Sequence, residues 1–190
     1  MHISLEQHLK KFSDLNESDL SVLKKYFRTH KLKKKELLLR ESSVCKDLFF
    51  VEKGCLRMYF LNKKSVEQIV QFALEGWWIT DYSSFMNNTP SEYYIQAIEA
   101  SEIVSVDKHK FNEMLREFPR LEKYFRIMTQ KTLAASQLKT KLLYEMSKEE
   151  FYVHFNSSFP EFMQRVPQYM IASYLGLTPE YLSELRKKNL

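Results

Sequence analysis

Short runs of β-branched and aromatic residues fill the segment from Glu36 to Val106. The runs are LLLR, DLFFVE, CLRMYFL, VEQIVQFAL, YYIQAIEA and EIVSV, and turn-like breaks separate them. In the fourth run, Val70, Phe72 and Leu74 alternate with a more polar set, which gives a strand one apolar face. Hairpin turns are expected at EKG (52–54) and NKK (62–64). Many short strands at near-regular spacing predict an antiparallel β sandwich or barrel.

On both sides of this segment the apolar positions recur at three and four residues. The first thirty residues are expected to form helices, one of them capped by Asn16 and running to about Arg28. The basic run KLKKKE at 31–36 is interpreted as a solvated entry to the first strand, with a nucleic-acid patch as the alternative. After Asp107 a short helix, KHKFNEMLREF, precedes Pro119, which can open the next helix at its first turn.

One long helix is predicted from about Pro119 to Met146. Its apolar stripe consists of Leu121, Phe125, Met128, Thr132, Ala135, Leu138 or Lys139, Leu142 and Met146. About 26 residues at 1.5 Å per residue make this helix close to 40 Å long. We expect a parallel dimer seam formed by Leu121, Phe125, Met128, Thr132, Ala135 and Leu142. Packing of the stripe within the chain's own core is the alternative. A capping box at Ser147 and Glu150 then starts a new helix.

The segment IASYLGLTPEYLSELRKK, Ile171 to Lys188, has the spacing of two short helices joined by a tight turn. Gly176 follows the first helix, where a left-handed residue commonly ends a helix. Thr178 supplies an N-cap oxygen, and Pro179 occupies the first helical position. This pattern predicts a helix-turn-helix, whose second helix enters the major groove of DNA. A plain helical hairpin with a solvated basic tip is the alternative.

Eight residues of this region are candidate DNA contacts. The expected phosphate contacts, which do not distinguish sequences, are Arg186, Lys187, Lys188 and the backbone near Gln168. The expected contacts to base edges are Thr178, Glu180, Ser183 and Glu184. A carboxylate such as Glu184 can accept a hydrogen bond from the amino group of cytosine. The two acidic residues also leave a second interpretation open, in which a ligand-sensing module uses its terminal helices to contact a protein partner.

Composition and charge narrow the class of protein. The chain has 190 residues, which suits one large or two small domains, and a net charge of +5. This modest excess is compatible with an acidic partner but does not separate nucleic acid from a membrane surface. No run approaches the ~18 apolar residues of a membrane span, and the start, MHISLEQHLKKF, lacks the apolar core of a signal peptide. We therefore expect a cytoplasmic protein without membrane contact.

No arrangement of catalytic or metal-binding side chains is recognisable in the sequence. Cys45 and Cys55 are ten positions apart, with no CxxC pair, and are expected to be reduced structural thiols. The five histidines are scattered and form no HxH or HExxH pair. A jelly-roll enzyme of the cupin type would need clustered histidines and a carboxylate. We expect no enzymatic activity, no catalytic residues, no metal and no cofactor.

Antiparallel strands, then a long helix, then a helix-turn-helix is the element order of a known family. The chain resembles the cyclic-AMP receptor protein and fumarate–nitrate regulator (CRP/FNR) family of bacterial transcription factors, most specifically in RVPQYMIASYLGLTPEYLSELRKK. The resemblance implies an α+β fold with three parts. These are a cyclic-nucleotide-binding-like antiparallel β jelly roll at 1–118, a long dimerisation helix at 119–146 and a helix-turn-helix DNA-binding domain at 147–190. It also implies a homodimer on near-palindromic double-stranded DNA, with RNA polymerase and a small-molecule effector as further candidate partners.

The chain departs from the family pattern at both functional ends. The family binds cyclic nucleotides with a Gly-Glu pair and an Arg-Ser/Thr-Ala segment, where this chain has WWITD (77–81) and NTPSE (88–92). No Arg is present there to neutralise a phosphate, so we expect no cyclic-AMP binding. The candidate lining of a pocket for another effector, of unknown identity, is Trp77, Thr80, Asp81 and Ser91. At the DNA end, Glu184 stands where family members often carry Arg, and no strand pair follows to form a wing.

Overall fold

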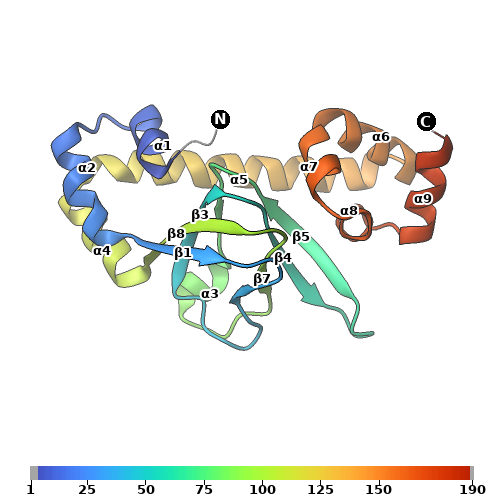
Figure 1. Ribbon diagram of the computed structural model, residues 1–190, viewed down its shortest axis with the longest axis horizontal. Helices are drawn as coiled ribbons and strands as arrows, with labels where there is room; N and C mark the ends of the chain where they lie inside the picture. The colour runs from blue at the N-terminus through green and yellow to red at the C-terminus, as the bar shows by residue number, and fades with distance from the viewer. Residues whose placement is uncertain (1–3, 189–190) are drawn as a thin grey trace. The chain divides into compact units, whose positions relative to one another are not determined.

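A computed structural model describes residues 4–188 and contains two compact units (Figure 1). The first unit consists of the chain up to Phe60 together with Gln71–Thr129. The second consists of Leu61–Val70 together with the chain from Gln130 onward. The division between them therefore runs through the long helix α5 (Arg120–Glu145), not between the three predicted parts. The boundaries at 118/119 and 146/147 stay a prediction about function.

Two four-stranded sheets with antiparallel neighbours form the β-rich part of the chain, which confirms the predicted sandwich. The first sheet has the order β1 (Arg28–Leu32), β8 (Ser101–Asp107), β3 (Asp47–Lys53) and β6 (Trp78–Ile79). The second has the order β2 (Leu37–Leu39), β7 (Tyr94–Ala97), β4 (Leu56–Leu61) and β5 (Glu67–Ala73), so β5 is an edge strand. Buried residues from both sheets, among them Val51, Leu56, Ile95 and Ile103, pack into one apolar core.

The β structure begins earlier than the sequence predicts. Helix α2 (Glu17–Leu23) is followed by the 3₁₀ turn η1 (Lys24–Tyr26), and the chain is already extended from Arg28. The prediction of a helix to about Arg28 was therefore wrong. The reason is that β1 pairs with β8 along its whole length. Pairing with a strand far away in the sequence outweighs the weak helical preference of the segment RTHKL.

The connection between β3 and β4 turns at Gly54, but the hairpin predicted there is wrong, because β3 lies in the first sheet and β4 in the second. Gly54 has φ +101, a conformation that side chains rarely adopt. A Cβ atom built there would lie 2.2 Å from Ser101 Oγ and 2.8 Å from Ser101 Cα. The glycine is therefore required both by the turn and by the close approach of the neighbouring backbone.

Helices cover one end of the first sheet and form a second core with it. These helices are α1 (Leu5–Phe12), α2, α4 (Lys108–Glu117) and the first part of α5. The capping boxes at Ser4 and Asn16 fix the starts of α1 and α2, and the second of these confirms the predicted cap. Tyr124 of α5 lies at the centre of this core and is fully buried. Its hydroxyl lies 2.7 Å from Nδ1 of His8 and accepts a hydrogen bond from Nε1 of Trp78 at 2.8 Å.

The predicted dimer stripe of α5 is largely used within the chain. Leu121 is fully buried in the helical core, and Phe125 and Met128 pack against that core. Leu142 is 8% exposed, Thr132 is half-buried, and Ala135 is exposed. Residues already covered by their own chain have little surface to offer a second copy. The alternative, packing within the core, therefore describes most of this stripe.

The C-terminal part is helical throughout its described residues. It consists of α6 (Lys148–Ser158), α7 (Pro160–Arg165), α8 (Gln168–Leu175) and α9 (Pro179–Lys188). The capping box of Ser147 and Glu150 is formed, as predicted, and its hydrogen bonds lower the pKa of Glu150. Phe155 contacts the rings of Phe159 and Phe162. Phe155 and Phe162 are buried and belong to the core of the small helical part, whereas Phe159 is 41% exposed.

Candidate nucleic-acid interface

Helices α8 and α9 form the predicted helix-turn-helix, and the turn between them is built by local chemistry. Gly176 is left-handed at φ 69 and ψ 29, and its N–H donates to carbonyls at the end of α8. The N–H of Leu177 then donates to the carbonyl of Ala172 at 2.8 Å. Thr178 Oγ1 accepts from the N–H of Tyr181 at 3.2 Å, which caps the start of α9.

An apolar contact holds the two helices together. On α8 and the turn, the residues Ile171, Ala172, Leu175 and Leu177 are buried, and Ala172 is fully buried. On α9, Leu182 and Leu185 are buried at 1% and 0% exposure. The apolar positions predicted from the sequence pattern are therefore the buried contacts between α8 and α9, and they fix which side of α9 faces outward.

Seven of the eight predicted DNA contacts lie on α9 or at its N-cap. Thr178, Glu180, Ser183, Glu184, Arg186, Lys187 and Lys188 are all exposed. The acidic Glu180 lies in the first turn and the three basic residues lie in the last, which complements the helix dipole. Gln168 differs, because it is half-buried at the start of α8 and its Oε1 is buried without a hydrogen-bond partner. The structure thus presents cations for phosphates and polar groups for base edges on one short helix.

Three of the four predicted pocket residues are buried in the jelly roll, and two of them, Asp81 and Ser91, hydrogen-bond to each other. Asp81, Ser91 and Thr80 are 5%, 2% and 3% exposed. The carboxylate of Asp81 accepts from the Ser91 hydroxyl at 2.7 Å and from the backbone N–H of Ser84 at 3.2 Å. The second of these bonds caps helix α3 (Tyr82–Asn87), which the sequence analysis did not predict. The pattern Asp81-x-x-Ser84 is an N-cap signal that could have shown it.

Thr80 and Cys45 complete this hydrogen-bonded cluster. Thr80 Oγ1 donates to the carbonyl of Asp47 at 2.9 Å and lies 3.2 Å from Cys45 Sγ. Burial raises the pKa of the Cys45 thiol, which fits the expected reduced structural cysteine. Trp77 does not belong to the cluster, since it lies in the turn before β6 and is 44% exposed. The structure therefore places Thr80, Asp81 and Ser91 among buried hydrogen bonds, and their use as an effector pocket stays a prediction.

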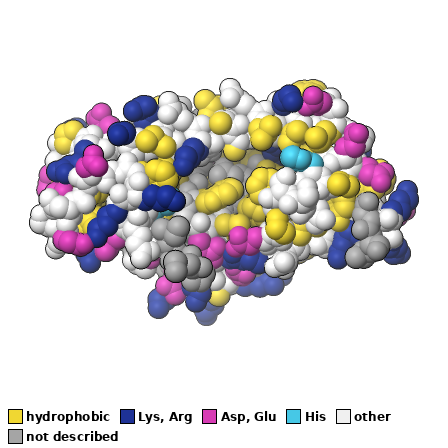
Figure 2. Space-filling model, turned by 90° about the horizontal axis from the view of Figure 1, so that it is seen from above, with side chains coloured by type: hydrophobic (Ala, Val, Ile, Leu, Met, Phe, Trp, Pro, Cys, Tyr) yellow, Lys and Arg dark blue, Asp and Glu magenta, His cyan; other side chains and the backbone are white. Residues whose placement is uncertain are grey.

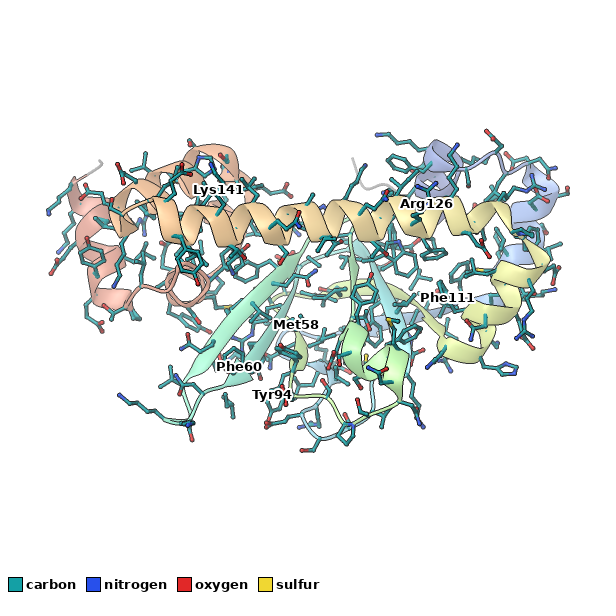
Figure 3. The ribbon with its side chains drawn as sticks, turned by 180° about the vertical axis from the view of Figure 1, so that it is seen from behind. Met58, Phe60, Tyr94, Phe111, Arg126 and Lys141 are labelled. Atoms are coloured by element: carbon teal, nitrogen blue, oxygen red, sulfur yellow. The ribbon has the colours of Figure 1, made fainter. Side chains whose placement is uncertain are left out.

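A buried arginine of the jelly roll was missed by the sequence analysis. Arg57 is 4% exposed, and its Nε and one terminal nitrogen donate to Gln96 Oε1 at 2.9 and 2.6 Å. Its guanidinium lies 4.2 Å from the centre of the Tyr59 ring, which in turn stacks on Tyr94 at 5.0 Å. Figure 3 shows Met58 and Phe60, the residues on either side of Tyr59, together with Tyr94. Arg57 lies opposite Gln96 across the strand pair, whereas its neighbour Leu56 lies in the core, so Arg57 points away from that core.

Helix α5 also has an exposed side. The outer stripe, as we call it, consists of Arg126, Gln130, Leu133, Gln137, Thr140 and Tyr144, which recur at alternating spacings of four and three and are all exposed. Leu133 is 57% exposed and Tyr144 is 89% exposed. Hydrophobic side chains are also visible on the face shown in Figure 2. The spacing is that of a coiled-coil seam. The sequence analysis missed it because the outer stripe mixes polar and apolar residues, whereas the buried stripe is mostly apolar.

A surface cleft of about 670 Å³ lies between η1 and α4 in the first unit. Its charged groups largely pair with one another: Glu117 accepts hydrogen bonds from Lys25 and Tyr26, which hold the pKa of this carboxyl below its usual value. Lys110 donates to the carbonyl of Lys25. Within residues 4–188 no group of three or more His, Cys, Asp and Glu side chains is arranged to hold a metal ion. No described helix is long and apolar enough to cross a membrane.

Comparison with known proteins agrees with this architecture. Residues 29–118 match the family described as "Cyclic nucleotide-binding domain". No curated protein matches the chain. Among solved structures, the c-di-GMP responsive global regulator CLP of Xanthomonas campestris is similar at 14% identity and a TM-score of 0.74, over 91% of each chain.

Two further solved structures have the same fold. FixK2 from Bradyrhizobium japonicum is similar at 18% identity and a TM-score of 0.70, over 85% of this chain and 83% of that one. A CooA mutant from Carboxydothermus hydrogenoformans is similar at 21% identity and a TM-score of 0.68, over 93% and 85%. At these identities the likeness shows the fold, and the predicted jelly roll, long helix and helix-turn-helix are confirmed as that fold.

Proposed function

We propose that this chain, which carries a cyclic nucleotide-binding domain at residues 29–118 and has the fold of the CRP/FNR transcription regulators, is a homodimeric, sequence-specific DNA-binding regulator. The observation that carries the proposal is the exposed side of α9. Seven candidate contact residues are exposed on α9 and at its N-cap, and the buried Leu182 and Leu185 fix the orientation of this helix. This is the geometry that a recognition helix needs in the major groove.

The contacts to DNA divide by chemistry. Arg186, Lys187 and Lys188 supply charge for phosphates, which sets affinity and makes binding salt-dependent. Ser183 and Glu184 are hydrogen-bonding groups at exposed positions in the middle of α9, where base edges would lie. A carboxylate at this position favours cytosine, whose amino group donates, over bases that present only acceptors.

Dimerisation is assigned to the outer stripe of α5. Its positions alternate at four and three residues, so they stay on one side of the helix for five helical turns. Leu133 and Tyr144 provide apolar area, and the intervening glutamines provide hydrogen bonds. A second copy packed along this stripe places two recognition helices on one DNA duplex.

The jelly roll is proposed to work without a cyclic nucleotide. The carboxylate of Asp81 is buried and already accepts hydrogen bonds from Ser91 and the start of α3. An anionic phosphate placed beside this carboxylate would meet like charge in a poorly solvated site. The guanidinium of Arg57 is buried and already donates two hydrogen bonds to Gln96. The identity of any effector is open.

Selection of DNA from a random duplex library with the purified protein tests the proposal. The selected sites should be near-palindromic, and a gel shift should show one dimer bound per site. Replacement Lys187→Ala should weaken binding to all sequences alike and lower the salt slope by about one. Replacement Glu184→Ala should relax the preference at one position of each half-site, by roughly 1–3 kcal/mol of discrimination.

A matched control is available in the same unit. Lys141 is an exposed lysine of α5 that pairs with Glu145, outside the helix-turn-helix (Figure 3). Lys141→Ala removes the same charge as Lys187→Ala and should leave the affinity for DNA and the salt slope unchanged. If Glu184→Ala and Lys187→Ala both bind DNA as the unchanged protein does, α9 is not in the groove. Contact with a protein partner, which the carboxylates of Glu180 and Glu184 favour, would then be the better function.

The dimer is tested separately by sedimentation. Leu133→Glu combined with Tyr144→Glu places two charges on the outer stripe without touching the buried core, and should give folded monomers. The comparison variant Ser136→Ala changes an exposed residue of α5 outside that stripe and should remain dimeric. A doubly charged protein that stays a folded dimer would place the seam elsewhere.

A further inference from the structure

One serine of the helix-turn-helix bonds to a strand. Ser173, half-buried on α8, accepts a hydrogen bond from the backbone N–H of Ile69 at 3.0 Å and donates to the carbonyl of Glu67 at 2.8 Å. Both strand residues belong to β5, the edge strand of the second sheet, and all three residues lie in the second compact unit. An edge strand leaves a row of N–H and C=O groups unpaired. The Ser173 hydroxyl satisfies one of each, as a neighbouring strand would.

A second side chain reaches the same stretch of β5. Lys139 of α5 donates to the carbonyl of Val70 at 3.4 Å. Its ammonium lies 3.5 Å from the centre of the Tyr174 ring, which is next to Ser173 on α8. Ile69 itself is 4% exposed. Helices α5 and α8 therefore both contact the short stretch of strand from Glu67 to Val70.

These contacts leave the candidate DNA face uncovered. The hydrogen bonds of Ser173 start from α8, whereas the exposed contact residues lie on α9 and its N-cap. Helix α9 packs on α8 through the buried Leu182 and Leu185. A restraint on α8 is therefore passed to α9 without competing with DNA.

We propose that Ser173 is a positioning residue for DNA recognition, whose two hydrogen bonds to β5 form a backbone clamp that fixes the direction in which α9 points. The inference rests on the proposed dimeric DNA-binding function. A dimer must hold its recognition helices at the separation of the half-sites, about 34 Å or one helical turn. A restrained helix-turn-helix loses less freedom when both half-sites are bound, so the clamp strengthens binding to two correctly spaced half-sites in particular.

Hydrogen exchange on the free protein tests whether the clamp exists. In Ser173→Ala the Ile69 N–H loses its acceptor, so its protection should fall by about tenfold. Ser173→Thr keeps a hydroxyl and should restore most of the protection. Ser157→Ala, which removes a serine hydroxyl from α6 of the same unit, should leave the exchange of Ile69 unchanged. Unchanged protection of Ile69 in Ser173→Ala would overturn the clamp.

Binding to designed duplexes tests the positioning role. The duplexes carry the selected site as a single half-site, as a full palindrome, and as palindromes with one base pair added or removed at the centre. Ser173→Ala should bind the full palindrome about fivefold more weakly and discriminate less between spacings, while its affinity for the single half-site stays within about twofold. Equal losses on half-site and palindrome, or an unchanged spacing preference, would overturn the proposal.

The two proposals fail in distinguishable ways. A wild-type protein that selects no DNA sequence would overturn the DNA-binding function and the positioning role together. A wild-type protein that binds a spaced palindrome, with Ser173→Ala equally strict about spacing, would overturn the positioning role alone. Rescue of spacing discrimination by Ser173→Thr would support it.

Discussion

Replacing Tyr124 with phenylalanine removes one buried hydroxyl and leaves the ring in place. That hydroxyl accepts from Trp78 Nε1 and lies 2.7 Å from Nδ1 of His8. Because an indole nitrogen can only donate, the Tyr124 oxygen is the acceptor in the bond with Trp78, whereas the direction of the bond with His8 depends on the imidazole tautomer. Burial raises the pKa of Tyr124, so this residue is an uncharged hydroxyl at neutral pH. One group thus links α1, β6 and α5.

The expected loss of stability in Tyr124→Phe follows from the hydrogen-bond partners Trp78 and His8. Trp78 is 8% exposed, so Tyr124→Phe leaves its N–H without an acceptor in a poorly solvated core, which costs about 1–3 kcal/mol. The lost hydrogen bond to His8 adds about 1 kcal/mol. No cavity term applies, because the aromatic ring stays in place. The free energy of unfolding should therefore fall by roughly 2–4 kcal/mol.

Urea unfolding followed by tryptophan fluorescence measures this loss. Trp77 and Trp78 both lie in the first unit, so the signal reports the part of the chain that contains Tyr124. The control Tyr169→Phe removes the same atom from a 50% exposed position of α8, outside the proposed dimer seam, and should stay within about 0.5 kcal/mol of the unchanged protein.

A double-mutant cycle with Trp78→Phe identifies the source of the loss. In the Trp78→Phe background no indole N–H is left unpaired, so the loss of unfolding free energy caused by Tyr124→Phe should be smaller by at least about 1 kcal/mol. A Tyr124→Phe variant as stable as the control, or a penalty that is the same in both backgrounds, would refute this account of the core.

Three further predictions concern single positions. Burial lowers the pKa of Lys139 from 10.5 to about 8, so the unfolded chain binds its proton more tightly. The charged, poorly solvated Lys139 therefore destabilises the folded state fully below pH 8, and this effect disappears as the pH rises to 10.5. Lys139→Met should raise the unfolding free energy by roughly 1–3 kcal/mol at pH 7 and by less at pH 10. Urea titrations at the two pH values check this, and equal gains at both would contradict it. Gly54→Ala should lose more than about 2 kcal/mol of unfolding free energy, because its Cβ collides with the Ser101 backbone at a positive φ. Thermal denaturation measures the loss, and a near-neutral result would mean that the turn between β3 and β4 shifts freely. Ser147→Ala should lower stability by about 1 kcal/mol through loss of the α6 cap, and circular dichroism melts that match those of the unchanged protein would show that the cap is dispensable.

The sequence by itself determined the features that arise from neighbouring residues. The αL residue Gly176, the cap at Thr178 and the capping box at Ser147 each involve groups within a few positions, so their chemistry is visible in the sequence. The alternation in the β segments and the helical spacing of the C-terminal leucines follow from the periods of strand and helix. Fold class and the outward side of α9 could therefore be predicted.

The tertiary structure alone decided which surfaces stay free. The apolar stripe of α5 was visible in the sequence, but only the packing showed that Leu121 is covered by the chain's own core while Leu133 is exposed. The buried hydrogen bond between Asp81 and Ser91 likewise became visible only in the structure. Ser173 bonds to a residue 106 positions away, and no local pattern encodes such a contact. Periodicity identifies the apolar side of an element, whereas the partner of that side depends on how distant parts of the chain come together.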